Sequence, residues 1–124
     1  MRDEAQGAGA VGLRMYEAFN GRDLAALETI LAPDFVSHPL RTTGVEAVAD
    51  AWSAMFEAHP GIRVCVEDML VDRDRVAVRS VLHGLSGPRP DGAEPGPVMK
   101  EIFRVRHGRI AELWGLSSLG RPAG

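Results

Sequence analysis

One carboxylate in an apolar stretch is the clearest sign of chemistry in this sequence. Alternation from Met99 to Val105 predicts a strand in which Glu101 shares its face with Met99, Phe103 and Val105. Burial disfavours the charged form of a carboxyl group, so Glu101 must be paired, hydrogen-bonded or held protonated. A raised pKa suits a general acid or base. The alternative is a structural ion pair with Arg79 or Arg104, and we favour function because perturbed groups cluster at functional sites.

His38 is the second candidate for proton transfer. It follows Val36 on one side of a short extended segment that begins at Asp34, and imidazole titrates near neutral pH. A lone histidine is as often a satisfied polar residue. The four histidines show no pair with the spacing of metal ligands, and the Gly-rich stretch from Gly84 to Gly96 lacks the signature of a phosphate-binding loop. We therefore expect neither a metal nor another cofactor.

The elements that position these residues follow from hydrophobic periodicity. Helical spacing predicts helices over Val11–Phe19, over Leu24–Leu31 with Asp23 as its cap and Pro33 as its stop, and from Gly44 to Phe56. Alternation then predicts four strands, beginning at Ile62, Val76, Met99 and Arg109. The order favours an α+β fold whose helices pack on one face of a strongly curved, mostly antiparallel sheet, with an interior pocket.

Length and composition limit the partners. The 124 residues suffice for one domain, which we place at 11–119 between a flexible N-terminal segment, 1–10, and a tail, 120–124. A net charge of −3 with Lys100 as the sole lysine argues against nucleic acid. No apolar run is long enough to span a membrane and no secretory signal is visible, so we expect a cytoplasmic protein. The Gly- and Pro-rich segment Ser86–Pro97 should be mobile and lie beside the pocket mouth.

Three segments carry a resemblance to a known family: YEAFNGRDL at 16–24, LAPDFVSH at 31–38 and EIFRVRHGRIAELW at 101–114. They are similar to the SnoaL-like polyketide cyclase group of the nuclear transport factor 2-like superfamily, over about Val11 to Leu119. The resemblance implies a cone-shaped fold with working groups on its inner face. It also implies a homodimer through the outer sheet face, where we expect Val81, Ile102 and Trp114 among the contacts because they alternate away from the pocket.

The resemblance also gives positions to the candidate residues. His38 matches the general-base aspartate of ketosteroid isomerases, where SnoaL-like proteins often carry histidine, and Glu101 matches the isomerases' oxyanion-side aspartic acid. Two positions depart from the pattern. Gly115 stands where the cyclases carry a catalytic aspartate, and the isomerases' tyrosine falls at Met15, with Tyr16 expected on a different azimuth of the helix.

These observations favour a cofactor-independent acid/base enzyme acting on a small hydrophobic carbonyl compound, of polyketide cyclase or isomerase type. His38 would remove a proton beside a carbonyl and Glu101 would hydrogen-bond the enolate oxygen, both from one interior cavity. The apolar pocket wall is predicted from its inward positions, with one hydroxyl at the end of the last strand: Met15, Phe19, Trp52, Phe56, Val78, Met99, Phe103, Leu113 and Ser117. The alternatives are a non-catalytic binding protein with the same pocket, favoured by Gly115, and an epoxide hydrolase, which would want a second carboxylate.

Overall fold

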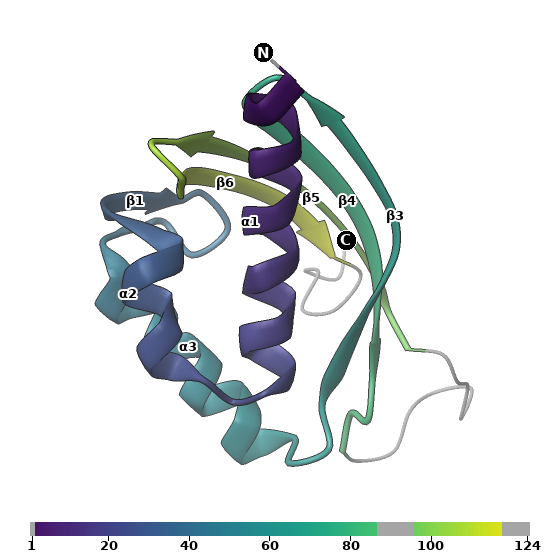
Figure 1. The fold of residues 1–124 in the computed structure, drawn as a ribbon. Coiled ribbons are helices and arrows are strands. Elements are labelled where there is room, and N and C mark those ends of the chain that lie inside the picture. The colour runs from purple at the N-terminus through teal and green to yellow at the C-terminus, as the bar shows by residue number, and fades with distance from the viewer. Residues whose placement is uncertain (1, 87–95, 118–124) are drawn as a thin grey trace.

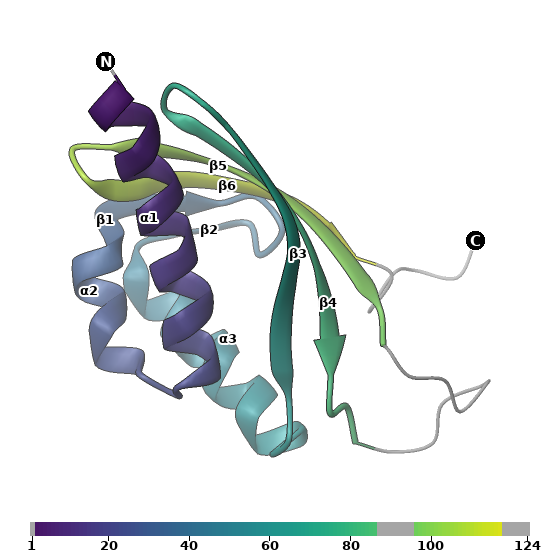
Figure 2. The same ribbon diagram turned by 45° about the vertical axis from the view of Figure 1, so that its right-hand side comes forward.

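The chain folds as one layer of helices against one face of a curved sheet (Figure 1). The structure, a computed structural model, describes residues 2–86 and 96–117. The six strands lie in the order β2-β1-β6-β5-β4-β3. Figures 1 and 2 show the helices on the same side of the sheet and its other face without a helix. We call these the inner and outer faces.

The first helix, α1 (Arg2–Asn20), is longer than predicted. It includes residues that the sequence assigned to a flexible segment, because Ala8 is buried in the same core as Val11. Its C-terminal end is where it was expected. There the Asn20 side chain donates a hydrogen bond to the Val64 carbonyl and accepts one from the Val64 amide, both at 2.8 Å, which fixes the end of α1 to the sheet.

The second helix is shorter than predicted. A 3-10 turn, η1 (Leu24–Ala26), leads into α2 (Leu27–Ile30), and the Asp23 cap is confirmed by its side chain, which accepts from the Ala26 amide. The strand β1 (Leu31–Ser37) then begins before Pro33, so Pro33 does not end the helix as expected. Proline fits inside β1 because the pairing of β1 with β6 is irregular between Leu31 and Val36, where a missing N–H leaves no ladder bond unmade.

Apart from the short strand β2, which was not predicted, the rest of the chain follows the predicted order. After β2 (Thr42–Thr43) and α3 (Val45–Ala58), the strands β3 (Arg63–Asp72), β4 (Arg75–His83), β5 (Val98–Arg106) and β6 (Arg109–Ser117) pair antiparallel in sequence. The predicted turn at His107-Gly108 is confirmed, with positive φ at both residues. The pair β1·β6 is parallel, so the sheet is mixed. No helix in the described part of the chain is long and apolar enough to cross a membrane.

The inner face of the sheet holds the core, and α1 lies unusually close to it at one point. Phe103 on β5 is fully buried among residues from α1 and the neighbouring strands. A methyl group added at Gly12 would lie 2.5 Å from Cζ of Phe103, well inside van der Waals contact. The absence of a side chain at Gly12 therefore sets the distance between α1 and β5.

Gly12→Ala should lower the free energy of unfolding by about 1 to 2 kcal/mol, because overpacking costs about 1–3 kcal/mol and alanine recovers up to about 1 kcal/mol of helix propensity. Urea unfolding measures this difference. Gly7→Ala in the same helix is the control, since its new methyl would have nothing within 4 Å and should stabilise the helix. A Gly12→Ala protein as stable as Gly7→Ala would contradict this account of the packing.

Candidate functional site

A tyrosine and a carboxylate meet on the inner face of the sheet. The Tyr16 hydroxyl donates a hydrogen bond of 2.6 Å to Oε1 of Glu101. Tyr16 is buried on α1, one turn after Gly12, and Glu101 is partly buried on β5, two residues before Phe103. Strand alternation thus predicted the inward face of Glu101 correctly. We expected the Tyr16 side chain to point away from the pocket side of the helix, and this was wrong. Gly12 and Tyr16 lie four residues apart on α1, and both face β5.

Burial changes the proton affinity of both groups. It raises the pKa of Tyr16, and the nearby Glu101 carboxylate raises it further, so the phenol keeps its proton and acts as a donor. The pKa of Glu101 is raised by burial, which disfavours its charge, while the hydrogen bond from Tyr16 opposes that shift. The result is a carboxyl group that ionises at a higher pH than usual and is held in one orientation through Oε1.

On the inner face, no charged side chain of the described part of the chain interacts with Glu101. Its cross-strand neighbours are Val78 on β4 and Gly115 on β6. The alternative that we ranked second, an ion pair of Glu101 with Arg79 or Arg104, is not formed: Arg79 lies near Glu67 and Asp68 at 3.7–3.8 Å, and Arg104 lies 3.2 Å from Glu112. Tyr16 is thus the one hydrogen-bond partner of Glu101 among the described residues, and Oε2 is left without one.

A second polar group on the inner face has no partner. The Ser80 side chain is fully buried on β4, and its hydroxyl makes no hydrogen bond with any described residue. Ser80 pairs with Met99, two positions along the ladder from the Val78–Glu101 pair, so it lies on the same face as the carboxylate. Sequence reasoning missed Ser80, although its alternation with Val76 and Val78 placed it inward.

His38 lies on the outer face, so its ring and the Glu101 carboxyl group lie on opposite sides of the sheet, although both residues border the hollow described below. Phe35 and Ser37 are the buried positions in the second half of β1, and the strand ends at Ser37. The His38 ring stacks on Trp114 at 5.1 Å with 9° between the planes, and 45% of its side chain is exposed. The prediction of one interior cavity shared by His38 and Glu101 is therefore wrong.

His38 belongs to a charged network instead. Its Nε2 lies 2.7 Å from Oε2 of Glu112, whose other oxygen accepts from Arg104. The hydrogen bond with His38 is the main reason that the pKa of Glu112 is lowered, with Arg104 adding to it. Arg75 covers the Trp114 ring at 5.3 Å. The parallel pairing of β1 with β6 creates this network, and local periodicity gave no signal of that pairing.

The predicted pocket wall divides into two groups. Met15, Phe19, Val78 and Phe103 are buried in the core. Partly exposed side chains packed against that core come from α3 and from both sides of Glu101: Trp52, Phe56, Met99 and Leu113. Phe19 contacts Trp52 and Phe56 at 5.1 and 5.0 Å between ring centroids. Ser117, whose side chain is not described, pairs with Met99, and the predicted mobile loop lies largely outside the described residues, which omit 87–95.

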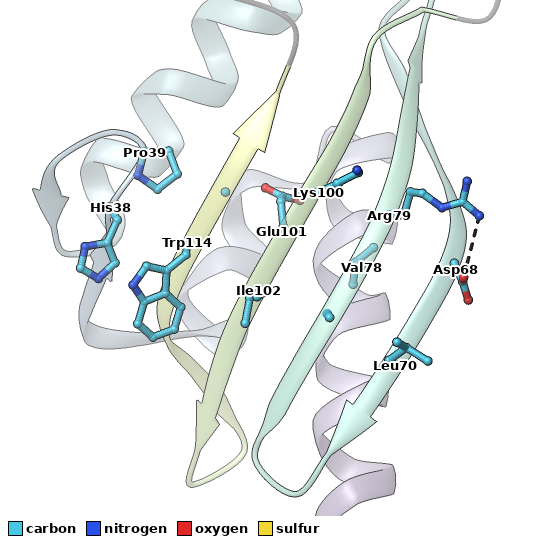
Figure 3. Close-up of a pocket in the computed structure, with 12 residues that line it drawn as sticks. His38, Pro39, Asp68, Leu70, Val78, Arg79, Lys100, Glu101, Ile102 and Trp114 are labelled. Carbon is cyan, nitrogen blue, oxygen red and sulfur yellow. Dashed lines mark ion pairs between the residues drawn. The ribbon is translucent and has the colours of Figure 1, made fainter. Parts of the chain in front are cut away.

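The outer face carries an open hollow of about 610 Å³ (Figure 3). Trp114, Ile102, Leu70, Arg79 and Lys100 surround it with their side chains, and His38 and Pro39 form one end. Glu101 and Gly115 border it from the strands, although the Glu101 carboxyl group is bonded to α1 on the other side. Among the described residues no three His, Cys, Asp or Glu side chains are grouped as metal ligands would be.

Glu101→Gln should flatten the dependence of stability on pH. Burial raises the folded-state pKa of Glu101 above its unfolded value, so its contribution is full below the unfolded pKa and is lost as pH rises through the folded pKa. Glutamine does not ionise and so does not lose this contribution. The stability of the variant relative to wild type should therefore rise as pH increases from acidic to neutral. Urea unfolding between about pH 4 and pH 8 tests this.

Glu112→Gln is the matched control with the opposite sign. The lowered pKa of Glu112 means that its contribution is present above the unfolded pKa and is lost as pH falls through the folded pKa. This variant should therefore lose stability relative to wild type at neutral pH. If both variants run parallel to wild type across the range, the two carboxyl groups do not have the environments described.

Solved structures show where this fold recurs. The chain is similar to IdmH of Streptomyces antibioticus, a proposed polyketide cyclase, with 29% identity over 90% of this chain and 91% of IdmH, and a TM-score of 0.77. A proposed polyketide cyclase from Sinorhizobium meliloti is 27% identical, with 86% and 94% of the chains covered and a TM-score of 0.71. A protein of the same description from Bacillus cereus, at 23% identity, 95% and 78% coverage and a TM-score of 0.81, shows the fold alone.

The fold is thus the α+β cone of nuclear transport factor 2-like proteins, with a sheet that does not close on itself. No curated protein is significantly similar in sequence. A family model for the SnoaL-like domain matches residues 13–113, which run from the middle of α1, through Tyr16 and Glu101, into β6. This chain belongs to the SnoaL-like domain family.

Proposed function

We propose that this chain is a cofactor-independent enzyme that moves a proton on a small, hydrophobic carbonyl compound, of polyketide cyclase or isomerase type. The observation that carries the proposal is the partly buried Glu101 carboxyl group, held by the Tyr16 hydroxyl at 2.6 Å among apolar side chains. Its raised pKa brings it toward the range in which one group both accepts and returns a proton. The similarity to proposed polyketide cyclases supports the substrate class.

The geometry assigns different work to the two oxygens of Glu101. Oε1 accepts from Tyr16 and is thereby fixed, while Oε2 has no partner among the described residues and is available to substrate. In the proposed step the C–H bond beside the carbonyl breaks, its proton passes to Oε2, and its electron pair becomes the enolate. Return of the proton to another carbon, or attack of the enolate on a second carbonyl, completes isomerisation or cyclisation. Tyr16 is a positioning residue in this scheme.

The alternative is a binding protein with the same inner face and no turnover. Two observations favour it: His38 lies on the outer face, and Gly115 supplies no side chain opposite Glu101. One proton-transfer group then remains where the sequence led us to expect two. No observation favours the epoxide hydrolase alternative, because no second carboxylate contacts Glu101 in the described part of the chain.

Exchange of the α-protons of β-tetralone, an apolar ketone, in deuterated water tests the enzyme proposal. Wild type should accelerate the exchange, and Glu101→Gln should lower its rate by roughly a hundredfold to ten-thousandfold, since an amide does not accept the proton. Glu112→Gln makes the same substitution on the outer face and should exchange like wild type. Equal rates for wild type and Glu101→Gln, with β-tetralone bound by both, would favour the binding protein.

Tyr16→Phe tests the positioning role through the pH profile. The Tyr16 hydrogen bond lowers the pKa of Glu101, so its removal raises that pKa further. Because the base must be ionised, the rise of the exchange rate with pH should move to higher pH in Tyr16→Phe. Measurement of the exchange rate against pH checks this, and a rate that falls at every pH without a shift of the profile would mean that Tyr16 acts only through the fold.

We also propose that the outer face joins two copies of this chain. Leu70 is 70% exposed and Ile102 45% exposed beside Trp114, and both signs of charge surround them, with Asp68 across from Lys100. An apolar centre with a mixed charged rim suits an isologous interface. Val81, which the sequence placed among the contacts, is buried within the chain and is left out.

Light-scattering mass at micromolar concentration tests the dimer. Wild type should give twice the chain mass, and Ile102→Asp should give the chain mass, because it would place a carboxylate from each copy in an apolar interface. Leu13→Asp is the control, since Leu13 is 44% exposed on α1, on the other side of the sheet. A wild-type protein of single-chain mass would rule out the dimer.

A further inference from the structure

Gly115 is a strand glycine without a structural reason in the backbone or in the packing. Gly84 has a positive φ, and a methyl group there would overlap the Gly61 carbonyl oxygen. Gly12 is excluded from carrying a side chain by Phe103. Gly115 has no positive φ, and a methyl group there would make ordinary contacts of 3.4 Å. Since glycine weakens a strand, its use at this position calls for another explanation.

The surroundings of Gly115 supply that explanation. It pairs with Glu101 across β5 and β6, so any side chain at this position would lie on the same face as the carboxylate. The nearest side-chain atoms to an added methyl group would be Cγ of Glu101 and Cγ of Pro39, on opposite sides. The missing side chain thus leaves a gap about one methyl group in size between Glu101 and Pro39, directly beside the carboxyl group, and all three residues border the hollow described above.

We propose that this gap receives the carbonyl-bearing end of the substrate, so that Gly115 determines which ketones reach Glu101. The inference rests on the proposed function and assigns its substrate specificity. Without a side chain at Gly115, the edge of a substrate ring that carries the carbonyl can approach the β6 backbone, which brings its α-carbon within reach of Oε2. A side chain at this position would leave room only for a narrower compound.

The charges around the gap define the chemical class. The described residues that surround Glu101 on the inner face are Tyr16, Val78, Met99, Phe103 and Leu113, none of which carries a charge when Tyr16 keeps its proton. On this face an anionic compound would meet the Glu101 carboxylate without a cation to balance it, because Lys100 and Arg79 lie around the hollow on the outer face (Figure 3). The gap therefore takes an uncharged carbonyl compound, and ring width rather than charge pairing sets the preference.

Two ketones of different width, β-tetralone and cyclohexanone, test the inference by deuterium exchange. Gly115→Ala should raise KM for β-tetralone roughly tenfold, the effect of one misplaced methyl group in an apolar site, and Gly115→Val should raise it further. KM for cyclohexanone should change much less, and the pH profile should keep its position because Glu101 and Tyr16 are untouched. Gly7→Ala, which adds its methyl group far from Glu101, should leave both KM values unchanged.

The outcomes separate this inference from the function on which it rests. Equal rises of KM for both ketones, or no rise for either, in a wild-type protein that exchanges β-tetralone would overturn the role of Gly115 and leave the enzyme proposal standing. If wild type does not accelerate exchange, the function fails, and NMR titration with the two ketones then decides about the gap through Kd. The role of the gap is supported if Gly115→Ala weakens the binding of β-tetralone but not that of cyclohexanone. It is refuted if the Kd of Gly115→Ala for β-tetralone equals that of wild type. Thermal unfolding of each variant confirms that it is folded.

Discussion

The contact between Gly12 and the Phe103 ring determines how α1 lies on the sheet, and the inner face depends on that distance. One turn further along α1, Tyr16 reaches Oε1 of Glu101 at 2.6 Å. At the end of the helix, the two hydrogen bonds between Asn20 and Val64 hold the same spacing against β3. A helix displaced outward at Gly12 would leave the Tyr16 hydroxyl short of the carboxyl group and would leave Glu101 buried without a partner.

The inner face combines groups that a core chosen for stability alone would not contain. Glu101 carries a burial penalty that one hydrogen bond offsets only in part, and the buried Ser80 hydroxyl has no partner among the described residues. Glycine at position 115 weakens the strand beside them. These three features lie within one or two ladder steps of one another, while the core around Phe103 and Ile110 is apolar and closely packed. Such a concentration of unfavourable groups is typical of a site where function limits stability.

The sequence predicted those features that depend on local periodicity. Alternation placed Glu101 inward, helical spacing and Asp23 located the second helical segment, and His107-Gly108 marked the last turn. The position of His38 depends on the parallel pairing of β1 with β6, which joins residues more than seventy positions apart and has no local signature. Tyr16 was missed for a different reason. Its orientation was judged from the family pattern at Met15, whereas in the structure Gly12 and Tyr16, four residues apart on one face of α1, both face β5.

Lys100 has a practical consequence for any study of this protein. It is the sole lysine in the sequence, and it lies on the outer face of the sheet, with its neighbour Glu101 on the inner one. Amine-reactive reagents therefore have one side-chain target besides the α-amino group. A fluorophore coupled at Lys100 would lie on the outer face, at the rim of the proposed contact between two copies, and would leave the Tyr16–Glu101 side unmodified. A label on the sole lysine side chain thus reports on the face opposite the carboxylate.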